Sequence, residues 1–525
     1  MLGFAGCLTG DIFLETAEVK VTGTPGDRAG YAINISGDLN SDGNNDLVVT
    51  APQPGINEIY VFFGPIPPSS LSTATPDVVY TGPADSEAGW AITVNEITGD
   101  FHPDLVIAAP SENQGDGAVH VLAGPLSPGS YTSADDHSRV YGIGNFGSDV
   151  DVGDFNGDSN GDLAVGACRG FSNNVMGGAV YVVDGPLAPG NHQISSVARG
   201  HYTGDFHQGG VGCAVAAVGD VGAYGHDALL VGAYQDSPNI ESPEIDAAAG
   251  AAYLIYEPPS KMQKPIRDVA DATFLGAHAV HNAGYSLGGR GDFNGDGFGD
   301  VLIGAPGQFC TWYPNFFAGS TVCDIELPPE SVHVFLGGGT PAKPGPFGTV
   351  EPPVPDLTGT YIVDEGDVNI YASHPNPEVV PTSIHHSTFG MSVAWTNSAG
   401  RYRNGMSIDD ILIGAPALNR AYLVWGWDNP DEPPPSLVTI EDIGTVFYLG
   451  EHADEHAVSG EHEPTSDSLY GPDAAGLAVA GNGDIDHDYV QDVAISAPGQ
   501  LWYNTGPTKR PGRTFVMYGS KPKEN

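Results

Sequence analysis

The sequence predicts an all-β protein, a seven-bladed β-propeller that is closed by its own N-terminal strand. The first observation is composition: 73 Gly and 43 Pro among 525 residues disfavour long helices, because both residue types destabilise them. No extended stretch places apolar residues at the three- and four-residue spacing of a helix. Length alone would suggest several domains, so the domain count must come from internal repeats.

The second observation is a sevenfold repeat of the form Asp-Leu-Val-Val-x-Ala-Pro. The copies are DLVVTAP from Asp46, DLVIAAP from Asp104, DLAVGAC from Asp162, DALLVGAY from Asp227, DVLIGAP from Asp300, DILIGAP from Asp410 and DVAISAP from Asp492. A Gly-led apolar strand, such as AGYAINI from Ala29, precedes each copy. A strand that ends in or near Gly, such as EIYVFFG from Glu58, follows it. Seven similar units of short strands predict seven blades.

The third observation is the phase of a fourth strand type. Its copies are AEVKVTG from Ala17, DVVYTG from Asp77, RVYGIG from Arg139, ARGHYTG from Ala198, ATFLGA from Ala272, TYIVDE from Thr360 and TVFYLG from Thr445. The chain starts with this type and stops after the preceding one, so the first segment should complete the last blade and remove exposed edges. We predict a propeller over residues 17–519, with tails at 1–16 and 520–525.

These residues resemble the FG-GAP repeats of the integrin α-subunit propeller. The resemblance lies in paired FG or AG and GAP motifs with an Asp-rich loop between them, and it runs from about Ala17 to Gly519. GAP is replaced by TAP, AAP, SAP or GAC in some copies. The resemblance implies an extracellular or cell-surface module for adhesion or ligand binding that carries out no catalysis.

Four of the repeats carry a nine-residue loop with oxygen-bearing side chains at positions one, three, five and nine. The side chains are Asp38, Asn40, Asp42 and Asp46 in blade one; Asp154, Asn156, Asp158 and Asp162 in blade three; Asp292, Asn294, Asp296 and Asp300 in blade five; and Asp484, Asp486, Asp488 and Asp492 in blade seven. A hard cation such as Ca²⁺ takes six to eight oxygens. We therefore predict about four Ca²⁺ sites.

The family pattern completes these loops with a backbone carbonyl at position seven. That carbonyl falls on Asn44, Asn160, Phe298 and Val490. Position six usually needs Gly for a left-handed turn, and Ser159 and Tyr489 depart from that in blades three and seven.

The other three blades depart from the loop pattern. Blade two offers Glu96, Thr98, Asp100 and Asp104, so its calcium binding is left open. Blade four is one residue short between Asp220 and Asp227, and blade six retains only Asp410. We predict no Ca²⁺ in blades four and six.

Charge limits the partners of this chain. Lys and Arg total 18 against 65 Asp and Glu, a net charge of -47, which would repel nucleic acid. No apolar run is long enough to cross a bilayer. The opening MLGFAGC resembles the end of a bacterial lipoprotein signal, which makes Cys7 a candidate lipid anchor. A frayed terminus with an incidental thiol is the alternative.

Five cysteines are too few to form a disulfide framework in a chain of this length. Cys310 and Cys323 flank one loop and are the predicted bridge. Cys168 and Cys213 lie in apolar strand patterns, and we predict that they are small buried side chains rather than metal ligands.

Long insertions indicate where a partner would bind. Those at 235–248, 307–330, 364–388, 451–474 and 499–512 fall on the face opposite the calcium loops, because successive connections in a blade alternate between faces. We expect a protein or glycan ligand there. Trp312 and Trp502 are candidate anchors, and packing of these rings onto the blade ends is the alternative.

Several motifs suggest other chemistry. GYSLG at Gly284 matches a serine-hydrolase elbow, HADEH at His452 matches a zinc motif, and RGD begins at Arg290. The first two motifs need helices that a propeller lacks, and the Asp of RGD is already a predicted calcium ligand. Two rival functions remain: a polysaccharide lyase or hydrolase, for which His385, His386 and Asp364 are the only hints, and a structural envelope component.

Overall fold

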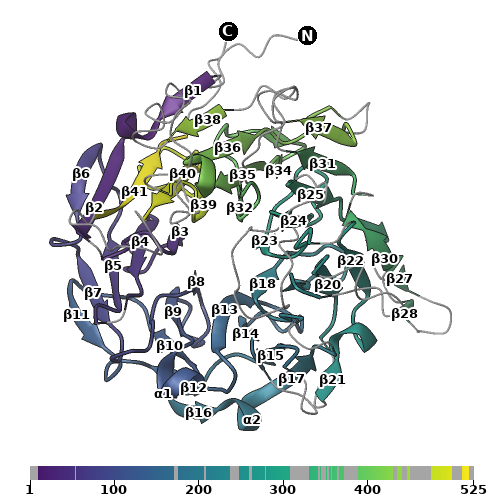
Figure 1. Cartoon of the computed structure of the whole chain (residues 1–525), viewed down its shortest axis with the longest axis horizontal. Coiled ribbons are helices and arrows are strands. Elements are labelled where there is room, and N and C mark those ends of the chain that lie inside the picture. The colour runs from purple at the N-terminus through teal and green to yellow at the C-terminus, as the bar shows by residue number, and fades with distance from the viewer. Residues whose placement is uncertain are drawn as a thin grey trace, which may run out of the picture.

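The protein is a ring of seven β-sheets in this computed structural model (Figure 1). The structure describes residues 10–25, 27–53, 55–170, 176–205, 209–236, 248–258, 263–277, 280–307, 330–340, 343–344, 350–351, 354–355, 357–363, 366–371, 388–429, 434–439, 446–449, 474–498 and 511–519. No helix within these ranges is long and apolar enough to span a bilayer. The predicted all-β, seven-bladed propeller is confirmed.

Four antiparallel strands form the body of each blade. They are β3 (Ile33–Gly37), β4 (Asp46–Ala51), β5 (Glu58–Phe62) and β7 (Val78–Thr81) in blade one; β8 (Ile92–Asn95), β9 (Asp104–Ala109), β10 (Ala118–Leu122) and β12 (Ser138–Tyr141) in blade two; β13 (Phe146–Gly153), β14 (Asp162–Ala167), β15 (Ala179–Val183) and β17 (Ala198–Thr203) in blade three; β18 (Ala214–Ala217), β19 (Leu229–Ala233), β20 (Ala251–Ile255) and β22 (Ala272–Leu275) in blade four; β23 (Ser286–Gly288), β24 (Val301–Ala305), β25 (Ser331–Phe335) and β31 (Val368–Tyr371) in blade five; β32 (Ser392–Thr396), β35 (Asp410–Ala415), β36 (Arg420–Val424) and β38 (Val446–Leu449) in blade six; and β39 (Val479–Gly483), β40 (Asp492–Ala497), β41 (Pro511–Met517) and β2 (Val19–Pro25) in blade seven.

The ring closes through the two ends of the chain. β2 pairs antiparallel with β41, with Val19 opposite Val516. In Figure 1 the purple N-terminal strand therefore lies beside the yellow C-terminal strands. The predicted completion of the last blade by the first segment is confirmed.

A fifth strand, which the repeat pattern did not predict, pairs in parallel with the outer strand of every blade. These strands are β11 (Gly129–Thr132), β16 (Gly190–Gln193), β21 (Gln263–Pro265), β30 (Gly359–Ile362), β37 (Leu437–Thr439), β1 (Gly10–Phe13) and β6 (Ser69–Ser72), on blades one to seven in that order. Each comes from the segment that leads to the fourth strand of the next blade. The fifth strands cover the outer edges, which would otherwise expose unpaired backbone groups.

Two boundaries differ from the prediction because of these strands. TYIVDE from Thr360 was expected to be the fourth strand of blade five, but Thr360 lies in β30, which pairs with β22 of blade four. The fourth strand is β31, whose first three residues are buried, whereas β30 is largely exposed. Similarly, β1 lies in the predicted tail 1–16 and pairs with β38, so residues on the N-terminal side of Ala17 also belong to the propeller.

Short elements complete the fold. They are the single turns α1 (Glu112–Gly115) and α2 (Ile194–Val197), the 3₁₀ turns η1 (Leu14–Thr16), η2 (Ile266–Asp268) and η5 (Pro416–Leu418), and the strand pairs β26 (Gly339–Thr340) with β29 (Val354–Pro355), β27 (Lys343–Pro344) with β28 (Val350–Glu351), and β33 (Tyr402–Arg403) with β34 (Met406–Ser407).

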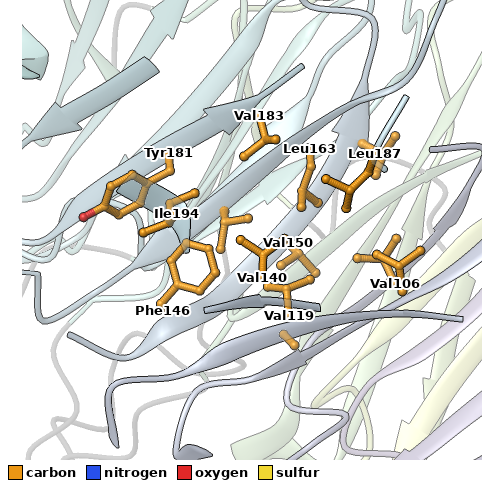
Figure 2. Close-up of a cluster of buried hydrophobic side chains, with 14 of the residues drawn as sticks. Val106, Val119, Val140, Phe146, Val150, Leu163, Tyr181, Val183, Leu187 and Ile194 are labelled. Carbon is orange, nitrogen blue, oxygen red and sulfur yellow. The ribbon is translucent and has the colours of Figure 1, made fainter. Parts of the chain in front are cut away.

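The hydrophobic core is divided among the junctions between blades. Seven buried clusters lie between neighbouring blades, one at each junction of the ring. Figure 2 shows the junction of blades two and three, where Val106 and Val119 meet Val150 and Leu163. Because the second strands are covered on both faces, all residues of strands such as β4 are buried. Burial on both faces explains the continuous apolar runs of the repeat.

A disulfide joins two blades. Cys168, which directly follows β14, is bonded to Cys213, which directly precedes β18. The prediction that these cysteines are separate buried side chains is wrong: both are half-buried, and they link blades three and four. The predicted pair Cys310 and Cys323 lies outside the described residues.

Replacing Cys168 and Cys213 together by Ser should destabilise the propeller. The bridge closes a loop of 45 residues, and removal should lower the free energy of unfolding by about 2–4 kcal/mol. Denaturant unfolding of the variant and the wild type measures the difference, and reduced wild type is the control. Equal stability of all three proteins would contradict the bridge.

Candidate functional site

The Asp-rich loops lie at one end of the blades, where each connects a first strand to a second strand. Position nine is the first residue of the second strand in blades one, three and seven, and it directly precedes that strand in blade five. These position-nine residues, Asp46, Asp162, Asp300 and Asp492, have 0% exposure. Positions five and six lie at exposed tips in all four loops. The loops therefore run from the surface down to a fully buried carboxylate.

The carboxylate at position one organises each loop by accepting backbone N–H groups from positions five and six. Asp38 accepts from Asp42 (3.1 Å) and Gly43 (2.8 Å), and Asp292 accepts from Asp296 (3.1 Å) and Gly297 (2.7 Å). Asp154 and Asp484 make the equivalent pairs of bonds. These bonds turn the loop back on itself, and alternate side chains share one side of the turn.

Position six adopts the left-handed conformation whether or not it is Gly. Its φ angle is 92° at Gly43 and 90° at Gly297, but also 67° at Ser159 and 69° at Tyr489. A side chain in this region costs about 1–2 kcal/mol. The bond from the position-six N–H to the position-one carboxylate offsets that cost, so all four loops form the same turn.

The donor atoms suit a hard divalent cation. Position three offers Asn40, Asn156, Asn294 or Asp486, and the carboxylate at position five accepts the N–H of Asn44, Asn160, Phe298 or Val490 at position seven. In blade seven, carboxylate oxygens of Asp484, Asp486 and Asp492 lie within 4.8 Å of one another. An oxygen-only set with several carboxylates fits Ca²⁺ better than a softer metal.

The position-nine carboxylate also holds the blade together. In blade one, Asp46 accepts the N–H of Leu39 at position two (2.7 Å) and of Gly64 beyond the third strand (2.9 Å). The Gly is required there because a Cβ atom on Gly64 would lie 2.2 Å from the carbonyl oxygen of Asn45. The same pair of bonds recurs at Asp104, Asp162, Asp300 and Asp492.

Burial makes these carboxylates costly to ionise. Burial raises the pKa of Asp46 to about 7, that of Asp162 to about 6 and that of Asp492 to about 7, against the opposing effect of the backbone N–H groups. For Asp300, burial raises the pKa well above its usual range. A nearby cation would offset the desolvation cost of the charged form.

Blades two and four depart from this arrangement. In blade two, Glu96 accepts the N–H of Gly99 at position four, and the Thr98 hydroxyl donates to Asp104. In blade four, Asp220 keeps its bonds to positions five and six, but positions three, five and nine are Gly222, Tyr224 and Ala228. Blade four therefore lacks the carboxylate and amide oxygens that the other loops offer at these positions.

Blade six places a guanidinium group beside its buried carboxylate. Arg401 forms an ion pair with Asp410, which has 0% exposure, and donates to the Gly426 carbonyl (3.0 Å). Gly426 in turn donates its N–H to Asp410 (2.9 Å), as the corresponding Gly does in the other blades. A protein cation thus lies at the position-nine carboxylate of this blade.

The other sequence motifs have structural roles. Ser286 of GYSLG lies in β23 and donates to the Gly390 carbonyl (2.8 Å) in the next blade. Arg290 of RGD donates to Asp227 and to the Val152 carbonyl (3.1 Å). Residues 452–456 of HADEH lie outside the described residues, as do Cys7, Trp312, Asp364, His385, His386 and Trp502.

A buried relay in blade five has the order of a nucleophile, a base and an orienting amide. Ser331 Oγ lies 2.8 Å from His333 Nε2, and His333 Nδ1 lies 2.7 Å from Asn369 Oδ1. Ser331 and His333 lie two residues apart in β25, and pairing with β31 brings Asn369 beside them, which spacing along the chain does not predict. Both Ser331 and His333 have 0% exposure, so the relay joins strands β25 and β31 inside the protein.

Comparison with known proteins finds one repeat family. Four segments match the FG-GAP repeat, at residues 29–62, 88–122, 146–183 and 283–320, which begin in blades one, two, three and five. The chain is 26% identical to integrin alpha-5 of Xenopus laevis over 42% of this chain and 20% of that protein. It is 32% identical to integrin alpha-PS2 of Drosophila melanogaster over 30% of this chain and 10% of that protein.

A second kind of protein shares the repeats. The chain is 30% identical to human phosphatidylinositol-glycan-specific phospholipase D over 34% of this chain and 21% of that protein. The chain spans about a fifth or less of the length of these curated relatives. Taken with the seven-bladed fold, the matches show that the chain carries FG-GAP repeats and resembles the integrin alpha-subunit propeller.

Proposed function

We propose that this chain is an extracellular, calcium-binding propeller that serves as an adhesion or ligand-binding module. Three kinds of observation support the proposal: the integrin relatives, the oxygen-only loops and the Cys168–Cys213 disulfide, which suits an oxidising compartment. The buried position-nine carboxylates carry the calcium part. Each is held in a loop with two or three further carboxylates, and such a cluster repels itself until a divalent cation binds.

The comparison between blades supports the same conclusion. Where the loop lacks its oxygens, as in blade six, Arg401 supplies a positive charge to the buried carboxylate. Where the position-nine Asp is absent, as in blade four, no such charge is needed. In blades one, three, five and seven the side-chain oxygens are present, and we propose that Ca²⁺ supplies the charge.

Ligand binding is proposed for the face opposite the loops. The longest insertions lie in connections that end on that face, and a protein ligand would follow the integrin pattern while a glycan is a second class. We propose binding rather than catalysis, because the Ser331 relay is fully buried. The phospholipase relative shares repeats with this chain, so the rival function is that of an enzyme built on the same scaffold.

Calcium titration tests the proposal. Calorimetry on chelator-treated protein should show about four sites, and 100 Kd of free Ca²⁺ should add about 2.7 kcal/mol of stability per site. Asp296→Ala at position five of blade five should remove one site. Asp220→Ala, at position one of blade four, is the control and should remove none, because we predict no Ca²⁺ in that blade. No heat of binding and no shift of Tm with chelator would refute calcium binding.

The blade-six ion pair gives a pH-dependent prediction. Burial raises the pKa of Asp410 to about 6, while Arg401 opposes that rise. Because this folded pKa is above the unfolded value, the contribution of Asp410 to stability falls as pH increases through 6. Arg401→Met should remove about 3–5 kcal/mol at pH 8 and less at pH 5, measured by denaturant unfolding. An equal loss at both pH values would contradict the pairing.

Substitution of Trp312 and Trp502 by Ala tests the ligand face. Binding to cell-surface extracts or to a glycan array in Ca²⁺ should weaken, while Tm should stay unchanged because a ring that only anchors a ligand adds little to folding. A large fall in Tm would show instead that these rings pack against the blades.

A further inference from the structure

The first residue of three calcium loops is hydrogen-bonded to a side chain of the next blade. The backbone N–H of Asp154 donates to Asp227 Oδ2 (2.9 Å), that of Asp292 to Asp409 Oδ2 (2.9 Å) and that of Asp484 to Asn45 Oδ1 (3.1 Å). Asn45 and Asp409 directly precede the second strands of their blades, and Asp227 lies one residue earlier than that. The same relation therefore recurs at three junctions.

At two of these junctions the bond is returned. The N–H of Asp227 donates to the Asp154 carbonyl (3.0 Å), and the N–H of Asp409 donates to the Asp292 carbonyl (2.8 Å). Both peptide groups of the first loop residue are thereby fixed by one residue of the neighbouring blade. We call this pair of bonds the loop clamp.

The clamping carboxylates have partners of their own. Asp409 is 8% exposed and accepts the Ser407 hydroxyl (2.5 Å), whereas Asp227 forms an ion pair with Arg290. Neither carboxylate lies in a loop with the oxygen pattern for Ca²⁺. Both come from blades four and six, the blades for which we predict no metal.

The clamp explains the departures of those two blades. The loop of blade four has its full nine residues in the structure, not one too few as the sequence pattern suggested. Ala228 takes the place of the buried Asp of the other blades, and Asp227 lies directly before it. Blade six has two adjacent carboxylates: Asp410 bonds to its own blade and Asp409 to the preceding one. Both sequences lack part of the calcium-loop pattern, but each keeps a carboxylate that accepts a hydrogen bond from the preceding blade.

We propose that Asp227 and Asp409 are positioning residues for the calcium loops of blades three and five, and that Asn45 has this role for blade seven. This inference rests on the proposed calcium binding. Fixing the peptide of position one holds the ligand side chain of Asp154, Asp292 or Asp484 in its loop. Loss of such an outer-shell contact typically lowers metal affinity about 10–100-fold.

Blade one differs and provides an internal contrast. The residue of blade two at the clamping position is Pro103, which has no polar side chain. Ser41 at the loop tip bonds to His102 (2.7 Å) instead. The site of blade one should therefore be insensitive to substitution of Asp227 or Asp409.

Calcium calorimetry on the whole chain tests the inference. Asp409→Ala should weaken one of the four sites at least about tenfold, and Asp409→Asn should restore most of that affinity, because Asn45 shows that an amide oxygen can accept the same bond. Asp409→Asn is therefore also the matched control, because it removes the charge of Asp409 but keeps an acceptor oxygen for the N–H of Asp292.

The outcomes separate the inference from the proposed function. If the wild type binds no Ca²⁺, calcium binding itself fails. If the wild type binds but Asp409→Ala keeps four sites of unchanged affinity, the clamp is refuted. It is also refuted if Asp409→Asn binds Ca²⁺ as weakly as Asp409→Ala. Asn45→Ala, which leaves no unpaired charge, applies the same test to blade seven should Asp409→Ala fail to fold.

Discussion

A buried carboxylate at the start of the second strand is the constraint on which the blades depend. It joins the loop to the end of the third strand by accepting two backbone N–H groups. One of them belongs to a Gly, and in blade one a nearby carbonyl oxygen leaves no room for a Cβ atom on that Gly. A buried charge is costly unless it is bonded and paired. The blades meet this cost differently: four loops carry oxygens for a cation, blade six uses Arg401, and blade four lacks both the Asp and the Gly.

This constraint explains why Asp and Gly recur together in the repeat. Blade four has Ala228 in place of Asp and Glu257 in place of Gly, so both partners of the interaction change in the same blade. Blade two keeps the pair without a full set of loop oxygens, and its Asp104 has a pKa raised by burial. The Asp therefore has a structural role even in a blade that lacks the full set of loop oxygens. A metal role depends on the other loop positions.

The sequence predicted the blade number and the ring closure because each depends on a local pattern repeated seven times. It did not predict the fifth strands, since segments such as SSLS from Ser69 are short, polar and largely unburied, and their partners lie in another blade. For the same reason the sequence pattern assigned TYIVDE to blade five, whereas Thr360 pairs with a strand of blade four. Cys168 and Cys213 lie 45 residues apart in different blades, so their pairing is visible only after the blades are adjacent.

The candidate site was predicted loop by loop, but its bonds to neighbouring blades were not. Spacing along the chain fixes which oxygens share a turn, whereas Asp227 and Asp409 act across a junction that spacing does not describe. A loop and its neighbour then form one unit, because the peptide that carries the first ligand is shared between them. Removal of the cation should consequently loosen the contact between two blades as well as one loop. If the proposed calcium binding holds, blades four and six would take part in the calcium response of the ring without binding metal themselves.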